Sequence, residues 1–356
     1  MRNGIRGMVP GRSLALTCAA TLLLSAASVR AVADAAETAA RWLGEMESAF
    51  SDLNYDGIFS YLTGSDLATL RVVHMVIDGR QRERLVHLNG APREILRDGE
   101  SVSCIVMPGD DLLKMEGSMP SGPFARGFVR RFDQVSDNYA LTLAGRDRVA
   151  NRTALRMLVQ PKDDDRFGYR LWLDEATKLL LRSELVDATG KRLEVFQFNQ
   201  LAIGPEVDVA ALEPTTASEG MVSHLTLADR VDPNKSPAAR ARYRLQWIPR
   251  GFQMAAADVR RKPSSLTDVV TMMYSDGLAA FSVFVEDMPP NGAASMVSRN
   301  GATVAVTHLT EFQGSTAERR VRHLITVVGE LPTGTAQRIA QSVEPGAGTE
   351  RTADTQ

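Results

Sequence analysis

Three Asx-Gly pairs, at residues 78–79, 89–90 and 98–99, recur at intervals of about ten residues. Such pairs favour the type I′ turn of a two-residue β-hairpin, because both central residues need a positive φ. Short strand-like runs surround the pairs, at residues 58–62, 70–77, 82–88, 93–96 and 102–107. Short strands that follow one another on short turns predict an up-and-down antiparallel sheet.

The same pattern returns further along the chain. Five more strand-like runs lie at residues 139–143, 154–159, 169–173, 179–185 and 193–198. A sheet of about ten strands has to curl, close or split, because strands twist. Ahead of the first strand, apolar residues at three- to four-residue spacing predict one amphipathic helix over residues 36–53. We therefore expect a curled sheet that packs around this helix, with an apolar interior that either is filled or holds a ligand.

A second unit follows a segment rich in proline and glycine. We divide the chain into a large domain at residues 34–210, a linker at 211–240, a small domain at 241–344 and a disordered tail at 345–356. Strand-like runs in the small domain lie at residues 244–248, 268–274, 278–286, 303–308 and 321–328. A helix is predicted over residues 335–343, so the small domain is expected to be a compact α+β unit.

The first 33 residues have the pattern of a secretory signal peptide. Arginines precede an apolar stretch at residues 14–29, and Ala31-Val32-Ala33 forms a small-residue cleavage signal. Cleavage after Ala33 would make Asp34, and not a cysteine, the first mature residue, so we expect an exported protein without a lipid anchor. Beyond this segment no apolar run of about 18 residues occurs, so no membrane-spanning helix is expected.

Composition and motifs argue against an enzyme and against a nucleic-acid-binding protein. The formal net charge is −2, which gives no strong positive field to attract nucleic acid. The chain lacks a P-loop, a dinucleotide-binding glycine motif, a nucleophile elbow and a zinc-protease motif. Its histidines lie far apart, and the triplet at residues 163–165 lacks the spacing of a calcium loop, so we interpret it as a solvated turn. We expect a binding protein with no catalytic residue, metal or cofactor.

Longer strings in both domains carry a more specific signal. They are YDGIFSY (55–61), CIVMP (104–108), QPKDDDRFGYRLWLD (160–174), LEVFQF (193–198), WIPRGF (247–252) and YSDGL (274–278). With these strings the chain resembles the RseB/MucB family, the periplasmic negative regulators of the envelope-stress sigma factor, over residues 40–343. The resemblance implies a mainly β protein: a large unclosed antiparallel β-barrel of the LolA/LolB type around helices, plus a small α+β domain.

The resemblance also implies a function. A protein of this family binds the periplasmic segment of a transmembrane anti-sigma factor of the RseA/MucA type and shields it from regulated proteolysis. The sigma factor then stays inactive. Lipopolysaccharide or fatty acyl chains would favour release, and the protein would form a homodimer or a higher oligomer in the periplasm.

Candidate site residues follow from the cavity that the resemblance implies. The candidates for lipid binding are Phe59, Tyr61, Val72, Val76, Met115, Phe124 and Phe128. The last three lie in a stretch at residues 108–132 that is rich in proline and glycine and that would act as a lid. Trp247 and Phe252 are the candidates for contact with the protein partner. Each of these side chains also fits plain core packing, because the lining of a lipid carrier and a core have the same composition.

Two other functions remain open on the sequence alone. A soluble carrier of lipids or lipoproteins would use the same cavity without a regulatory partner, although such a carrier has no need of the small domain. The second of these functions is that of a secreted hydrolase with an unrecognised active site, and a screen with esterase and glycosidase substrates would test it.

Overall fold

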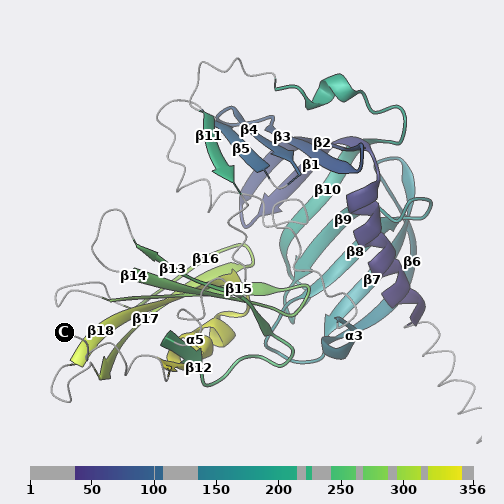
Figure 1. Cartoon of the computed structure of the whole chain (residues 1–356). Coiled ribbons are helices and arrows are strands. Elements are labelled where there is room, and N and C mark those ends of the chain that lie inside the picture. The colour runs from purple at the N-terminus through teal and green to yellow at the C-terminus, as the bar shows by residue number, and fades with distance from the viewer. Residues whose placement is uncertain are drawn as a thin grey trace, which may run out of the picture.

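The computed structural model describes residues 37–99, 101–106, 135–214, 222–226, 242–261, 268–287, 295–313 and 320–346. Their strands form two large antiparallel sheets, one in each of two domains that contact each other (Figure 1). The predicted signal peptide, the whole of the predicted lid and most of the predicted tail lie outside the described residues. No helix in the described ranges combines the length and the apolar character needed to cross a membrane.

The large domain is an 11-stranded sheet in the order β11-β5-β4-β3-β2-β1-β10-β9-β8-β7-β6. Its strands are β1 (Tyr55–Thr63), β2 (Asp66–Ile77), β3 (Arg80–His87), β4 (Arg93–Asp98), β5 (Ser101–Val106), β6 (Tyr139–Val149), β7 (Arg152–Pro161), β8 (Gly168–Asp174), β9 (Leu180–Val186), β10 (Arg192–Ile203) and β11 (Val222–Thr226). Within the described residues the edge strands β11 and β6 do not pair with each other, so the sheet is open. It curls around a helix at residues 37–52, as predicted (Figure 1).

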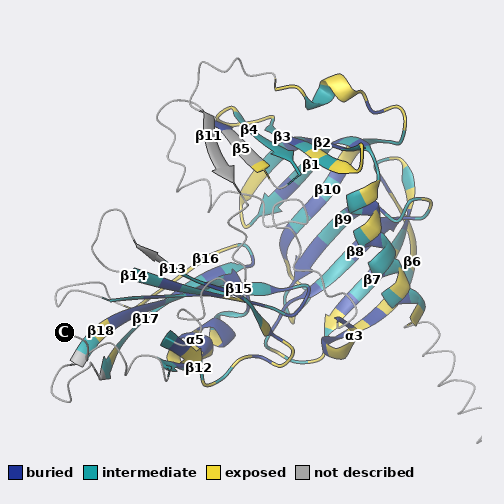
Figure 2. Cartoon of the chain, in the orientation of Figure 1, coloured by how far each residue is buried: buried dark blue, intermediate teal, exposed yellow. Residues whose placement is uncertain are grey.

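Alternating burial along the strands creates the core of the large domain (Figure 2). Phe59, Phe196 and Phe198 come from the neighbouring strands β1 and β10, and their ring centroids lie 5.0–5.9 Å apart. Leu43 and Met46 of the helix belong to the same buried cluster. Because each such side chain contributes about 1.5–3 kcal/mol when fully buried, this cluster holds the helix against the sheet.

The chain beyond β10 stays attached to the large domain. A short 3₁₀ helix, η2 (Val209–Leu212), lies against the buried ion pair between Arg84 and Glu94, whose Nε and Oε2 atoms are 2.9 Å apart. Arg84 also donates to the Ala211 carbonyl at 3.0 Å. Strand β11 then pairs with β5, so part of the predicted linker belongs to the large sheet as its eleventh strand.

The small domain is a six-stranded sheet in the order β13-β14-β15-β18-β17-β16. Its strands are β13 (Gln253–Arg261), β14 (Asp268–Ser275), β15 (Ala280–Asp287), β16 (Met296–Asn300), β17 (Thr303–Gln313) and β18 (Arg320–Glu330). Helix α5 (Thr333–Gln341) buries Ile339 and Ala340 in the core of this domain (Figure 1). β12 (Tyr243–Leu245) pairs with β19 (Val343–Pro345), and the four-residue helix α3 (Val135–Asn138) precedes β6 in the large domain.

The type I′ expectation holds at only one of the three early Asx-Gly pairs. At residues 78–79 both φ values are positive, at 53° and 74°, whereas at 89–90 and 98–99 only the glycine is positive. Asn89 instead uses its side chain, whose Oδ1 accepts a hydrogen bond from the Thr69 amide at 2.7 Å. β3 ends at His87 and β4 begins at Arg93, so Asn89-Gly90 lies in a five-residue loop, where the two positive φ values of a two-residue type I′ turn are not required.

Candidate binding site at the domain junction

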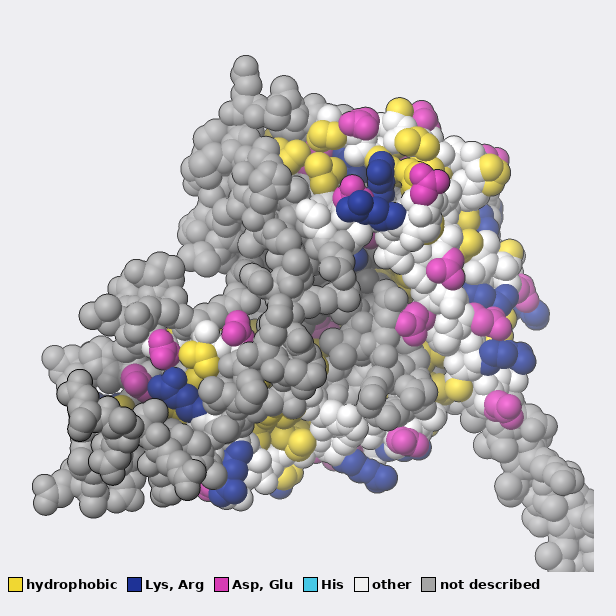
Figure 3. Space-filling view, in the orientation of Figure 1, with side chains coloured by type: hydrophobic (Ala, Val, Ile, Leu, Met, Phe, Trp, Pro, Cys, Tyr) yellow, Lys and Arg dark blue, Asp and Glu magenta, His cyan; other side chains and the backbone are white. Residues whose placement is uncertain are grey.

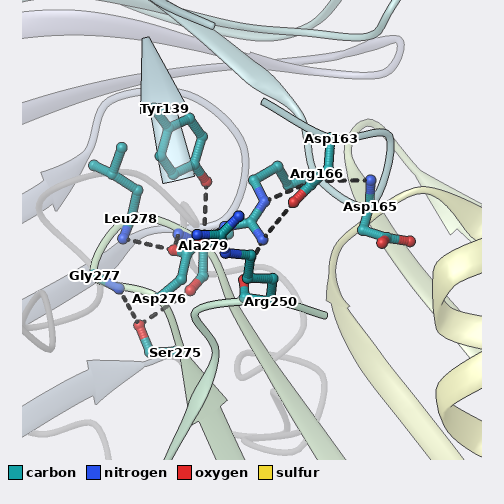
Figure 4. A network of polar contacts seen from close by, with 10 residues as sticks. All are labelled: Tyr139, Asp163, Asp165, Arg166, Arg250, Ser275, Asp276, Gly277, Leu278 and Ala279. Atoms are coloured by element: carbon teal, nitrogen blue, oxygen red, sulfur yellow. Dashed lines mark hydrogen bonds and ion pairs between the residues drawn. The ribbon is translucent and has the colours of Figure 1, made fainter. Parts of the chain in front are cut away.

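A buried ionic network joins the two domains. Arg166, in the loop between β7 and β8, donates from Nε and Nη2 to the two carboxylate oxygens of Asp163 at 2.9 Å each. It also pairs with Asp276 of the small domain and donates to the Arg250 carbonyl. The Tyr139 hydroxyl donates to the same Asp276 oxygen at 3.0 Å (Figure 4). The side chains of Arg166 and Asp276 are both 0% exposed, so one cation from the large domain is neutralised partly across the junction.

The two carboxylate oxygens of Asp276 bind different partners. Oδ1 accepts from the amides of Leu278 and Ala279, at 3.0 and 2.8 Å, and so fixes the turn between β14 and β15. Ser275 supports the same turn by accepting from the Gly277 amide at 3.1 Å. Oδ2 is left to face the large domain, where it meets Arg166 and Tyr139 (Figure 4).

The charge states at the junction follow from burial and from these partners. Burial works to lower the pKa of Arg166, but the bonds to Asp163 and the charge of Asp276 outweigh it and raise the pKa. Burial, followed by the charge of Asp276, raises the pKa of Tyr139 well above its ordinary value. Tyr139 therefore stays a hydrogen-bond donor. The Arg166 guanidinium also lies 5.2 Å from the ring centroid of Phe252, which adds a cation–π contact.

A second polar contact lies at the turn between β16 and β17. The Ala302 amide donates to Oε1 of Glu194 at 3.1 Å, and the Tyr61 hydroxyl donates to Oε2 of the same carboxylate at 2.6 Å. Gly301 has a φ of +58°, and a Cβ there would lie 2.7 Å from a methyl group of Thr63. A glycine is therefore required where this turn approaches the large sheet.

A pocket of about 340 Å³ opens beside the ionic network, and we call it the junction pocket. The large domain contributes Asp137, Asn138, Lys162, Asp163 and Asp165, and the small domain contributes Trp247, Ile248, Arg250 and Arg338. Arg338 of α5 lies over the Trp247 ring, with its guanidinium carbon 3.8 Å from the ring centroid. Across the junction, the Thr335 hydroxyl donates to Oδ1 of Asp165 at 3.0 Å. The pocket therefore exists only where the two domains meet.

The lipid candidates from the early strands lie in or beside the core of the large domain. Phe59 and Val72 are 0% exposed and belong to the cluster under the helix at residues 37–52. Tyr61 is 7% exposed, and its hydroxyl serves the contact at Glu194. Val76 is half-buried. Met115, Phe124 and Phe128 lie outside the described residues.

The two partner candidates differ in position. Trp247 is half-buried and lines the junction pocket. Phe252 is 3% exposed and packs on Phe281, with ring centroids 5.2 Å apart. Of the two, only Trp247 therefore offers a pocket surface to a partner.

Sequence reasoning missed the residues that join the domains. The acidic triplet at residues 163–165 was interpreted as a solvated turn, but Asp163 holds Arg166 and Asp165 accepts from the small domain. The available signal was an arginine directly after three aspartates, since a buried cation needs carboxylate partners.

In the described part of the chain, no group of three or more His, Cys, Asp or Glu side chains is placed to hold a metal ion. On the face shown in Figure 3, charged side chains of both signs mingle over the large domain, and no single-signed patch marks a partner surface there.

The fold is thus that of a two-domain β protein, whose domains are joined through a buried ionic network and share a pocket. Residues 38–216 match the family model of the MucB/RseB N-terminal domain, and residues 237–344 match that of the MucB/RseB C-terminal domain. The chain therefore belongs to the MucB/RseB family.

Relatives agree with this assignment over nine-tenths or more of their own length. The chain is 34% identical over 335 residues to the sigma factor AlgU regulatory protein MucB of Pseudomonas aeruginosa, which covers 93% of this chain and 99% of that protein. It is 28% identical over 306 residues to the sigma-E factor regulatory protein RseB of Escherichia coli K12, with 86% and 90% coverage. These relatives are named as regulatory proteins, which confirms the prediction of a non-enzymatic protein.

Solved structures give the same result for the fold. The complex of Pseudomonas aeruginosa MucA and MucB matches with a TM-score of 0.68 and 30% identity, over 87% of this chain and 99% of that chain. A second structure, of MucB with MucA(peri), matches with a TM-score of 0.67 and 31% identity, at the same coverage.

Proposed function

We propose that this protein is an exported regulator that holds an envelope-stress sigma factor inactive by binding the periplasmic segment of its transmembrane anti-sigma factor. One observation carries the proposal: both domains match the MucB/RseB family, and a MucB with the same two-domain fold has been solved together with MucA. The predicted signal peptide supports action in the periplasm, after cleavage behind Ala33.

Binding would act by shielding. A segment held against a folded protein is not available to a protease, since cleavage needs the chain in an extended, accessible form. The junction pocket, which includes Trp247, is the surface that we assign to this partner.

We further propose that acyl chains of lipopolysaccharide or lipid favour release, and that the protein forms a homodimer or a higher oligomer. Phe59 and Val72 lie beneath the helix at residues 37–52, so an acyl chain that reaches them has to replace Leu43 and Met46 of that helix. An acyl chain offers similar apolar contact, about 0.8 kcal/mol per buried CH₂. By linkage, lipid weakens partner binding by the same factor as partner weakens lipid binding.

The test is a titration of the mature protein, from Asp34, with the periplasmic segment of the anti-sigma factor from the same organism, with and without lipopolysaccharide. We expect tight binding that lipopolysaccharide weakens and protection of the segment from proteolysis. Absence of binding in both conditions, together with acyl lipid in the purified protein, would favour a lipid carrier. Binding that lipopolysaccharide leaves unchanged would keep the regulator and remove the lipid trigger.

A further inference from the structure

We infer that the junction pocket binds a carboxylate side chain of a protein partner, which forms ion pairs with Arg338 and Arg250. An apolar residue next to that carboxylate in the partner packs on Trp247. This inference rests on the proposed function, because it specifies the chemistry of the segment that binds. It assigns to the pocket an acidic and apolar peptide rather than a lipid or an inorganic anion.

The first argument is the pairing of charges around the pocket. Both oxygens of Asp163 are engaged by Arg166, and Oδ1 of Asp165 accepts from Thr335. Among the residues that the structure describes, no carboxylate lies within ion-pair distance of the side chains of Arg250 or Arg338. The two guanidinium groups at this pocket can therefore bind a carboxylate from outside the described residues, and a carboxylate is the planar group that matches their geometry best.

The second argument is that one of these cations is already held in place. The Arg338 guanidinium lies over the Trp247 ring at 3.8 Å, and the Trp247 carbonyl accepts from the Ser342 hydroxyl at 3.0 Å. A stacked guanidinium keeps its in-plane N–H groups available, so it can form a bidentate bond with little further loss of rotamer freedom. An acidic residue docked there therefore binds to a preorganised group.

The third argument favours a peptide over a small anion. Ile248 is 37% exposed beside Trp247, which gives an apolar surface next to the two cations. Asp137 is an exposed carboxylate at the pocket, and it can accept a main-chain N–H, a donor that a peptide has and an inorganic anion lacks. At about 340 Å³, the pocket lies near the lower end of the range of ligand sites, about 300–1,000 Å³, which suits a few residues of a chain.

The experiment measures binding of the fluorescently labelled periplasmic segment of the anti-sigma factor by anisotropy. The variants are Arg338→Gln and Arg250→Gln, and the control is Arg322→Gln, a partly exposed arginine at the opposite end of β18 from the junction. We expect each pocket variant to weaken binding at least tenfold and to reduce its dependence on salt, while the control stays within twofold of the parent protein. Melting temperatures confirm that all three variants are folded.

A second arm changes only the peptide and so does not depend on the folding of any variant. Replacing the acidic residues of the segment by their amides should weaken binding to the parent protein tenfold or more, but add little in Arg338→Gln/Arg250→Gln. Pocket variants that bind as well as Arg322→Gln would overturn the inference and leave the regulator intact. A parent protein that binds no segment at all would overturn the proposed function instead. Displacement of a bound segment by laurate alone, lost in Arg338→Gln, would assign the pocket to a lipid and also refute the inference.

Discussion

The ion pair across the junction gives a prediction whose size can be worked out from the structure. Asp276→Asn keeps an amide oxygen that can still accept from Leu278 and Ala279, so the turn between β14 and β15 should remain. It removes the negative charge that faces Arg166, whose side chain is 0% exposed. Breaking a buried pair from one side costs about 3–5 kcal/mol, because the remaining charge loses its compensation. Since Asp163 still contacts Arg166, we expect a loss near the lower limit, about 3 kcal/mol.

The assay is urea unfolding at neutral pH, followed by tryptophan fluorescence and by circular dichroism, because a two-domain chain need not unfold in one step. The control applies the same chemical change to Asp56→Asn, in a pair with Arg71 whose side chains are 23% and 37% exposed. A partly exposed pair contributes at most about 1 kcal/mol. Equal effects of the two substitutions would refute the reasoning, since the buried pair is expected to lose more than the partly exposed one.

Three further predictions concern other parts of the molecule. Burial lowers the pKa of the His74 imidazole, so the free energy of unfolding should fall as the pH drops below about 6.5, by up to about 1.4 kcal/mol per pH unit. His74→Phe should make the free energy of unfolding less dependent on pH, which urea titrations at pH 7.5 and 5.5 would measure. Gly251→Ala places a Cβ against the side chain of Asn138 and should lower the free energy of unfolding by about 1–3 kcal/mol more than Gly79→Ala, whose φ is also positive but whose surroundings are open; equal melting temperatures would contradict this. Phe128→Glu, in the predicted lid, should weaken uptake of a fluorescent fatty acid without lowering the melting temperature, and unchanged uptake would discard the lid.

The large sheet could be predicted because its signal is local. All ten strands expected between residues 58 and 198 are present, since alternation and turn residues act over a few positions. The strands that were missed lack that signal. All five residues of β16 are exposed, so no alternation marks it, and β13 includes three consecutive alanines, which favour strands poorly.

The junction could not be predicted in the same way. Arg166 and Asp276 are 110 positions apart, and nothing in either local sequence specifies the other as its partner. The pocket has the same origin, because α3, the loop between β7 and β8, the segment at residues 247–250 and α5 meet only after both domains have folded. Trp247 could be selected as an aromatic residue near the start of the small domain, but its stacking with Arg338 depends on the packing of α5.

Three of the strings by which the chain resembles its family meet at this one point. DDDRFG supplies Asp163 and Arg166, YSDGL supplies Asp276, and WIPRGF supplies Trp247 and Arg250. The resemblance therefore concerns how two domains are joined as much as how each one folds. Measurements of stability and of partner binding can therefore distinguish a residue that joins the domains, such as Asp276, from one that only lines the pocket, such as Arg338. Asp276→Asn should reduce both stability and partner binding, because it loosens the contact on which the pocket depends, whereas Arg338→Gln should reduce binding alone. A partner segment that binds equally well to Asp276→Asn would place its site outside the junction.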